Sequence, residues 1–208
     1  MNRGILRAYS DGIVTSTSIM VYGVGIVEGV DDMKSLPELS KGLHFTFNDR
    51  ALDEKIRRAE QISSREIKIV TEQLKEQIYQ FELLFGELPD HLDSHHSAHS
   101  HGQLVDLFKK ISRQISIPLR GFNGVRLITD FYKKVDTNSL IEIIKRLPNG
   151  VNELICHPGM VDNHLLRNSR YVFEREEELK TLTSREVINF IRNSGIELCT
   201  WSNFKHLI

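Results

Sequence analysis

Some segments of the chain have the apolar pattern of a strand and others have the apolar pattern of a helix, and the two kinds of segment alternate. A run of β-branched and apolar residues at 13–21 follows the turn signal Asp11-Gly12 and predicts a strand. Further strands are expected at 42–46, 91–93, 117–120, 153–156 and 196–200. Helices are expected at about 2–10, 104–112 and 139–147. Another helix is expected to begin at a cap formed by Thr183 and Glu186. This alternation favours an α/β fold with a mainly parallel sheet.

The clearest helical pattern runs from Ser64 to Phe85. Ser63 and Glu66 have the spacing of a capping box, and Gly86 followed by Pro89 is a stop signal. Apolar residues line one face of this segment, namely Ile67, Val70, Leu74, Ile78 and Phe81. The pattern therefore predicts an amphipathic helix whose role is packing.

Length and composition are typical of one globular domain. Hydrophobic residues make up 40% of the 208 positions and charged residues 26%, as in a protein that buries a sizeable core. The net charge of −1 does not favour nucleic acid or a membrane surface as partner, whereas a small molecule or sugar is easily accommodated. No apolar run reaches the ~20 residues of a membrane span. Cys156 and Cys199 lie in apolar runs and are expected to be buried thiols in a reducing compartment, which fits the cytoplasm.

Polar residues that could bind a ligand or take part in catalysis lie at or just after the ends of predicted strands. They are His44, Asp93, His95, Arg120 and His157. In parallel α/β folds the carboxyl ends of the strands converge on one region, where ligands bind. These residues are therefore candidates for a common site.

Five histidines lie between His91 and His101, directly after a predicted strand. In an extended chain alternate residues face the same way, so Asp93 and His95 would point into a site while His96 points away. Imidazole suits zinc and similar ions, and a carboxylate often holds the second ring nitrogen of a ligating histidine. The alternatives are a solvated histidine-rich loop, a metal-storage module and, for His44 alone, a satisfied core histidine.

Cys156-His157-Pro158-Gly159 leaves another predicted strand. A histidine fixed by a following proline is well placed to act as a general acid or base. A Cys-His nucleophilic pair and a purely structural turn are the other readings of this segment. Arg120, beside Gly121, is expected either to hold an anionic or polar substrate group or to pair with a surface carboxylate.

Several blocks of the chain together resemble the YdjC-like family of carbohydrate deacetylases. The blocks are Asn2-Arg3-Gly4-Ile5, Asp11-Gly12-Ile13-Val14-Thr15-Ser16-Thr17-Ser18, Gly42-Leu43-His44-Phe45, Pro89-Asp90-His91-Leu92-Asp93-Ser94-His95-His96 and Cys156-His157-Pro158-Gly159. They occur in the family's order over nearly the whole chain. The resemblance implies one deacetylase domain over 1–208 with an irregular (β/α) barrel of the polysaccharide-deacetylase type.

The resemblance also implies an activity and a set of site residues. The expected reaction removes an N-acetyl group from an amino-sugar oligosaccharide of the chitooligosaccharide type. His44 and His95 would bind a divalent metal, Mg²⁺ or Zn²⁺, and His157 would protonate the leaving amine. Asp93, His99 and Arg120 would contact the substrate or support the ligands.

One departure from the family pattern concerns the start of the chain. Family members begin with a strand ending in Asn-Ala-Asp-Asp-Phe-Gly, whose acidic pair supplies a third metal ligand and the catalytic base, whereas this sequence starts at Met1-Asn2-Arg3-Gly4. The first barrel strand is therefore expected to be missing, which would open strand edges to pairing in a homodimer.

This departure has three alternative explanations. The start of the chain is truncated, or the protein is an inactive relative that binds sugar or metal. Alternatively, another carboxylate, such as Asp93 or Asp49, takes the place of the missing acidic pair.

Overall fold

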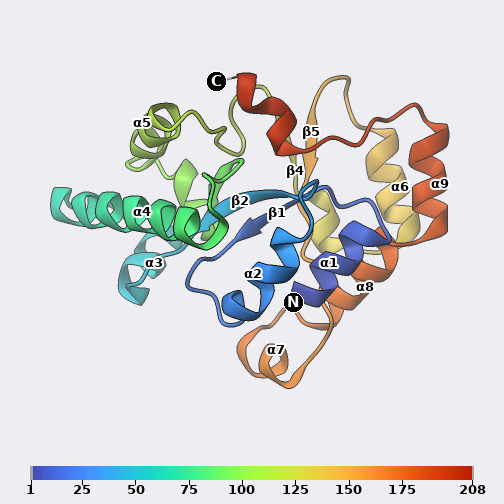
Figure 1. Cartoon of the computed structure of the whole chain (residues 1–208), viewed down its shortest axis with the longest axis horizontal. Coiled ribbons are helices and arrows are strands. Elements are labelled where there is room, and N and C mark those ends of the chain that lie inside the picture. Colours follow the sequence, from blue (N-terminus) through green and yellow to red (C-terminus); the bar gives the residue numbers. More distant parts are fainter. Residues whose placement is uncertain (1, 208) are drawn as a thin grey trace. The chain divides into compact units, whose positions relative to one another are not determined.

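Two parallel β-sheets organise the computed structural model, which describes residues 2–207 (Figure 1). Ser16–Asn123 and the residues from Thr200 onward form one compact unit, called here the three-stranded unit. The residues up to Thr15 and Gly124–Cys199 form the two-stranded unit. The expected mixed α/β fold with parallel sheets is confirmed. The barrel closure, the missing strand and the single domain over 1–208 stay predictions.

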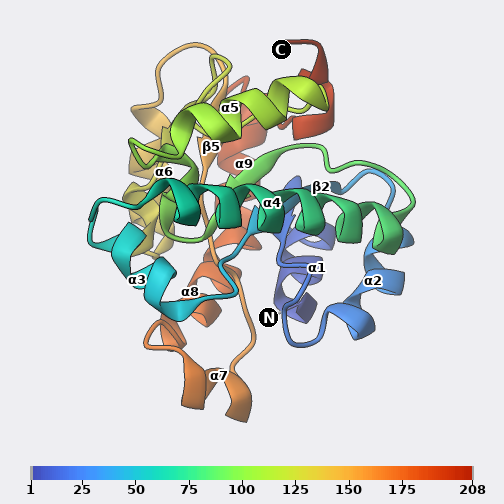
Figure 2. The same cartoon turned by 90° about the vertical axis from the view of Figure 1, so that its left-hand side faces the viewer.

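The sheet of the three-stranded unit has the order β1-β2-β3, with β1 at Ser16–Ile19, β2 at Ser40–Phe45 and β3 at Leu92–Ser94. All pairs are parallel. Helices α2 (Ile26–Lys34), α3 (Arg50–Arg57), α4 (Ser64–Phe85) and α5 (Val105–Gln114) belong to the same unit. Figure 2 shows α4 running past β2, against which it packs. This packing buries apolar side chains of both elements completely, among them Leu43, Phe45, Leu74 and Phe81.

Helix α4 has the bounds that the sequence pattern predicts. The Ser63 side chain accepts a hydrogen bond from the backbone N–H of Glu66, and the Glu66 side chain accepts one from the backbone N–H of Ser63. The helix ends at Gly86, whose φ of 77° lies in the left-handed region that glycine tolerates best. Both termini of α4 were therefore encoded by local sequence.

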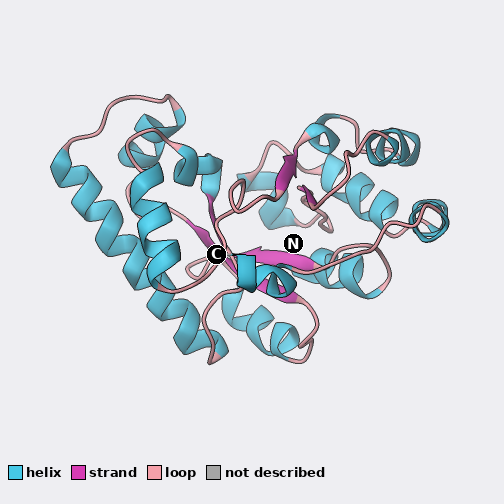
Figure 3. Cartoon of the chain, turned by 90° about the horizontal axis from the view of Figure 1, so that it is seen from above, coloured by secondary structure: helices cyan, strands magenta, loops and turns pink. Residues whose placement is uncertain are grey.

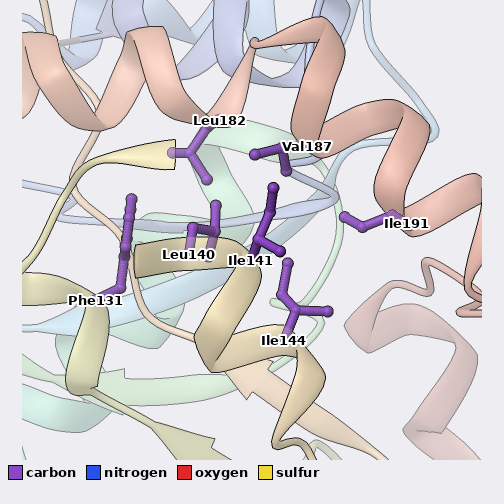
Figure 4. Packing of buried hydrophobic residues seen from close by; sticks show 7 residues of the cluster. All are labelled: Phe131, Leu140, Ile141, Ile144, Leu182, Val187 and Ile191. Carbon is purple, nitrogen blue, oxygen red and sulfur yellow. The ribbon is translucent and has the colours of Figure 1, made fainter. Parts of the chain in front are cut away.

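The two-stranded unit pairs β4 (Arg126–Ile128) with β5 (Asn152–Leu154). Its helices are α1 (Asn2–Ser10), α6 (Thr137–Lys145), α7 (Asn163–Asn168), α8 (Phe173–Leu182) and α9 (Arg185–Asn193). Figure 4 shows the core between α6, α8 and α9, formed by Phe131, Leu140, Ile141, Ile144, Leu182, Val187 and Ile191. Helix α1 packs against α8 in this unit.

Two strand predictions differ from the structure. The segment 117–120 forms a single bridge between Leu119 and Leu92 instead of a strand. Pro118 has no N–H to donate, and the chain turns at Gly121 with a φ of 75°. The segment 196–200 has an apolar pattern but, in the part of the chain that the structure describes, no strand pairs with it.

Other boundaries shift for identifiable reasons. The strand predicted at 13–21 shortens to β1 because the backbone N–H groups of Ile13 and Val14 donate to Leu182 and Ala8 in the two-stranded unit. The cap of α9 is Ser184 rather than Thr183, since the Ser184 side chain accepts from the N–H of Val187. Strand β4 lies outside the segments that the sequence pattern predicted as strands.

Figure 3 shows the short strands among longer helices. The described residues also form three 3₁₀ segments: η1 at His95–Ser100, η2 at Asp130–Lys133 and η3 at Trp201–Leu207. Among the helices of residues 2–207, none has the length and apolar character needed to cross a membrane.

Candidate functional site

His44 and Asp93 face each other across neighbouring parallel strands. The register of β2 and β3 places them opposite one another. The Nδ1–H group of His44 donates to Asp93 Oδ1 at 2.7 Å. This bond fixes the ring orientation and leaves Nε2 as the nitrogen that His44 would offer to a metal ion.

Asp93 is fully buried and is satisfied from three directions. Besides accepting from His44, it accepts at Oδ2 from the Ser18 hydroxyl at 2.9 Å and forms an ion pair with the Arg120 guanidinium. Arg120 also donates to the Ser18 oxygen at 3.2 Å. A buried carboxylate is stable only with such partners. Arg120 thus pairs with a buried carboxylate and not with the expected surface one, and its contact with a substrate stays a prediction.

His91 belongs to the supporting structure beneath this pair. It is fully buried, its Nε2 lies 2.9 Å from the Ser18 oxygen, and its ring stacks on Trp201 with centroids 5.1 Å apart. A Cβ at Gly42 would overlap the His91 ring, so glycine is required there. Burial moves the pKa of His91 well below its usual value, so the ring is neutral at pH 7. Trp201 is 5% exposed and is a core residue rather than a sugar platform.

His95 lies beside His44 at the start of η1. The two ring centroids are 5.9 Å apart in an edge-to-face arrangement. Two imidazoles that share one ion through ~2.0–2.1 Å bonds have centroids at most about 6.5 Å apart. The observed spacing is therefore compatible with a shared ion.

The backbone turns sharply after His95, and this turn changes the expected use of His96. His96 and Ser97 have φ values of 51° and 55°, in the left-handed region. The segment is thus not extended, and the His95 and His96 rings lie with centroids only 3.8 Å apart. The prediction that His96 points away from the site of Asp93 and His95 was wrong, because strand alternation ends at Ser94 and a ligand atom of His96 lies within 4.8 Å of those of His95 and Asp53.

Asp53, from α3, brings a carboxylate to the same place. Asp53, His95 and His96 each offer a ligand atom, and these atoms lie within 4.8 Å of one another. Asp53 Oδ1 is buried, lacks a hydrogen-bond partner among the described residues and lies 3.9 Å from His95 Nδ1. Asp49, by contrast, caps α3 by accepting from Ala51 and Leu52.

The donor set fits a divalent metal ion of the zinc or magnesium type. His95 is common to the His44 pair and to the Asp53 group, and imidazole with carboxylate is a usual ligand combination. Burial, followed by the positive charge of Arg120, lowers the pKa of His44 to about 4. Burial and the neighbouring histidines lower the pKa of His95. Both rings are therefore neutral at pH 7, the form in which histidine binds a metal.

His99 is buried and stabilises the turn at residues 95–97. It is 2% exposed, its Nδ1 lies 2.7 Å from the Ser94 hydroxyl oxygen, and its backbone N–H donates to the same oxygen at 2.8 Å. Burial, and next the charge of His44, lower the pKa of His99 to about 4. These contacts support the turn that carries His95 and leave little of the His99 ring exposed for a substrate.

His157 lies in the two-stranded unit, in the loop that follows β5. Its backbone N–H donates to Glu178 of α8, and its ring Nδ1 lies 3.9 Å from Glu178 Oε1. The Arg175 guanidinium donates to the His157 carbonyl at 3.3 Å, and the Arg175 carbonyl accepts from the Gly159 N–H at 3.1 Å. On the other side of the loop, a Cβ at Gly4 would collide with the Gly159 backbone. The loop is thereby held between α1 and α8.

The structure thus brings most of the predicted residues together within one unit. His44, Asp93, His95, His99 and Arg120 belong to the three-stranded unit, and His157 belongs to the two-stranded unit.

Sequence reasoning missed Ser18, Asp53 and Glu178. Ser18 ends a block already singled out by the resemblance, which was an available signal. Asp53 and Glu178 lie on helices rich in charge, where the sequence alone did not separate them from surface residues.

Comparisons with known proteins agree with these features. A family model described as "YdjC-like protein" matches residues 1–193. The chain is 29% identical to a carbohydrate deacetylase of Clostridium beijerinckii, over 100% of this chain and 94% of the relative. It is 31% identical to a carbohydrate deacetylase of Vibrio cholerae, over 97% of this chain and 90% of the relative.

A solved structure is also similar over most of its length. It is a protein from Enterococcus faecalis described as a cellobiose-phosphate cleavage protein. The TM-score is 0.82 at 26% sequence identity, and the match covers 97% of this chain and 92% of the other.

Proposed function

The chain belongs to the YdjC-like family, and from this premise we propose that it is a metal-dependent deacetylase of amino-sugar oligosaccharides. The relatives named as carbohydrate deacetylases support the reaction class. The observation that carries the proposal is the His44 ring, held at Nδ1 by buried Asp93 beside His95. Chitin-derived oligosaccharides are the proposed substrates, because they contain N-acetylated amino sugars.

The proposed metal ligands are His44 and His95. Asp53 is the proposed nearby carboxylate, since its ligand atom groups with those of His95 and His96. Asp93 is not proposed as the carboxylate ligand, because its two oxygens already accept from His44, Ser18 and Arg120. When bound, a divalent ion would polarise the acetyl carbonyl and lower the pKa of a water molecule. Asp93 acts one step away by keeping the His44 ring in its ligating tautomer.

Deacetylation breaks the amide C–N bond. The oxygen of water joins the acetyl carbon, and the two protons of that water end on the nitrogen, so that acetate and the ammonium form of the amine are produced. We assign the delivery of one of these protons to His157, whose position is fixed by Glu178 and whose side chain is 39% exposed.

Acetate release from diacetylchitobiose in the presence of Mg²⁺ or Zn²⁺ tests the proposed function. The wild-type protein is expected to release acetate, and His95→Ala is expected to abolish the release because His95 is common to both ligand groups. His101→Ala is the matched control, since His101 lies in the same histidine-rich segment but belongs to neither ligand group. Its ring Nδ1 accepts a hydrogen bond from the backbone N–H of Gln103.

The outcomes separate the proposal from its alternative. Full activity of His95→Ala refutes the metal assignment. Metal binding by the wild-type protein without any acetate release refutes the deacetylase and favours a binding protein built on the same scaffold.

A further inference from the structure

Two tyrosines and a histidine form an aromatic cluster in the two-stranded unit. The Tyr132 and Tyr171 rings stack with centroids 4.3 Å apart and an interplanar angle of 14°. The His157 ring meets both edge-on, at 5.6 Å from Tyr132 and 6.0 Å from Tyr171. Aromatic pairs of this geometry are attractive and hold each other's rings in place.

One buried carboxylate fixes this cluster. Glu178 is completely buried and accepts hydrogen bonds both from the Tyr171 hydroxyl and from the backbone N–H of His157. The Tyr171 hydroxyl oxygen also lies 3.2 Å from the Tyr132 carbonyl oxygen. Arg175 adds to this frame by donating from Nε to the Tyr171 carbonyl at 2.8 Å. The inner ring of the stack is therefore rigid.

The outer ring is open to solvent. Tyr132 is 46% exposed although it packs against Tyr171 and His157. A large aromatic ring that is held flat and left exposed costs free energy in water, because its apolar surface stays hydrated. A ligand with a flat apolar face would remove that surface from water.

We propose that Tyr132, supported by Tyr171, is a stacking platform for a pyranose ring of the substrate next to His157. This proposal rests on the proposed function, since it names the substrate-binding surface of the same reaction. A pyranose whose substituents are equatorial presents a face of axial C–H groups, which packs on an aromatic ring, while its polar groups point outward at the rim. The partly exposed His157 ring lies at the rim of the Tyr132 ring, where those polar groups would be.

Variants of Tyr132 test the platform. The dissociation constant of diacetylchitobiose is measured by ligand-observed NMR and by calorimetry in buffer with a chelator, and KM is measured separately with metal. Tyr132→Ala is expected to weaken binding about 10-fold, because the sugar loses the aromatic surface on which it packs. Tyr132→Phe keeps the ring and is expected to bind within about twofold of wild type.

Tyr79→Ala is the matched control. Tyr79 is a tyrosine of similar exposure, 54%, on α4 in the three-stranded unit. Its removal is expected to leave sugar binding unchanged. Equal melting temperatures of the four proteins show that no difference arises from unfolding.

The results separate the platform from the deacetylase activity. Tyr132-dependent binding without acetate release supports the platform and refutes the proposed function. Acetate release with the same KM in wild type and Tyr132→Ala overturns the platform and leaves the proposed function standing. Failure of the wild-type protein to bind the sugar overturns the platform.

Discussion

At the scale of single residues, two buried carboxylates hold the histidines of the candidate site in position. Asp93 and Glu178 are both completely buried, and each is surrounded by hydrogen-bond donors from segments far apart in the sequence. Because a buried charge without partners is unstable, each carboxylate determines the positions of the groups around it. Asp93 orients His44, and Glu178 positions His157.

Replacing Asp93 tests the first of these roles. Asp93→Asn removes the charge that holds the Nδ1–H tautomer of His44, so metal affinity is expected to fall roughly 10- to 100-fold. Calorimetric titration with Zn²⁺ measures this change, and Asp90→Asn is a control in the same segment because Asp90 accepts from Ser40 and Lys41 instead. Equal affinity of Asp93→Asn and wild type would show that His44 is not a ligand.

Glu178 gives a prediction about pH. Burial raises its pKa above the usual 4.5, although the hydrogen bonds from Tyr171 and His157 act in the opposite direction. The folded protein therefore keeps this proton to a higher pH than the unfolded chain, so the carboxyl's contribution to stability is complete below pH 4.5 and is lost as the pH rises through the raised pKa.

Urea unfolding of wild type and Glu178→Gln over a pH series checks this sign. Glutamine does not titrate, so the free energy of unfolding of wild type relative to the variant is expected to fall as the pH rises above 4.5. The groups facing Glu178, namely His157, Tyr171 and Arg175, are the same in both proteins. Parallel pH profiles of the two proteins would contradict the prediction.

At the scale of elements, α4 is the segment most completely specified by its own residues. Its amphipathic face packs on β2, and its first turn is closed by the capping box of Ser63 and Glu66. The strands, in contrast, are three to six residues long and depend on their neighbours for hydrogen bonds.

Replacement of the capping serine tests how much the local signal contributes. Ser63→Ala is expected to lower the free energy of unfolding by about 1 kcal/mol, since the N–H of Glu66 loses its acceptor. The adjacent Ser64→Ala is the control, because Ser64 is an exposed first residue of the helix without a capping role. Denaturant unfolding measures both, and equal stabilities of the two variants would exclude a contribution from the cap.

At the scale of the whole molecule, the fold persists where the sequence has changed. The similarity to the Enterococcus faecalis structure extends over 97% of the chain at only 26% identity. Such divergence is possible because a core tolerates apolar substitutions that keep volume and pattern.

The sequence by itself determined the elements whose signals are local. The bounds of α1 and α4, the buried face of α4 and the positions of His44 and Asp93 in strands followed from period, caps and turn residues. The candidate residues His44, Asp93, His95, His99, Arg120 and His157 were also selected from the sequence, but their roles stay predictions. Local patterns suffice where a residue's conformation depends on neighbours within one or two turns.

Only the tertiary structure decided which of these residues meet and how. The segment 196–200 has the apolar pattern of a strand, yet it forms none in the described chain, because a strand needs a partner that pattern cannot supply. The left-handed turn at His96 placed that ring beside His95, and α3 brought Asp53 to the same point. Register, turns and helix placement depend on contacts between distant segments, so the geometry of the site arises from packing and not from residue order.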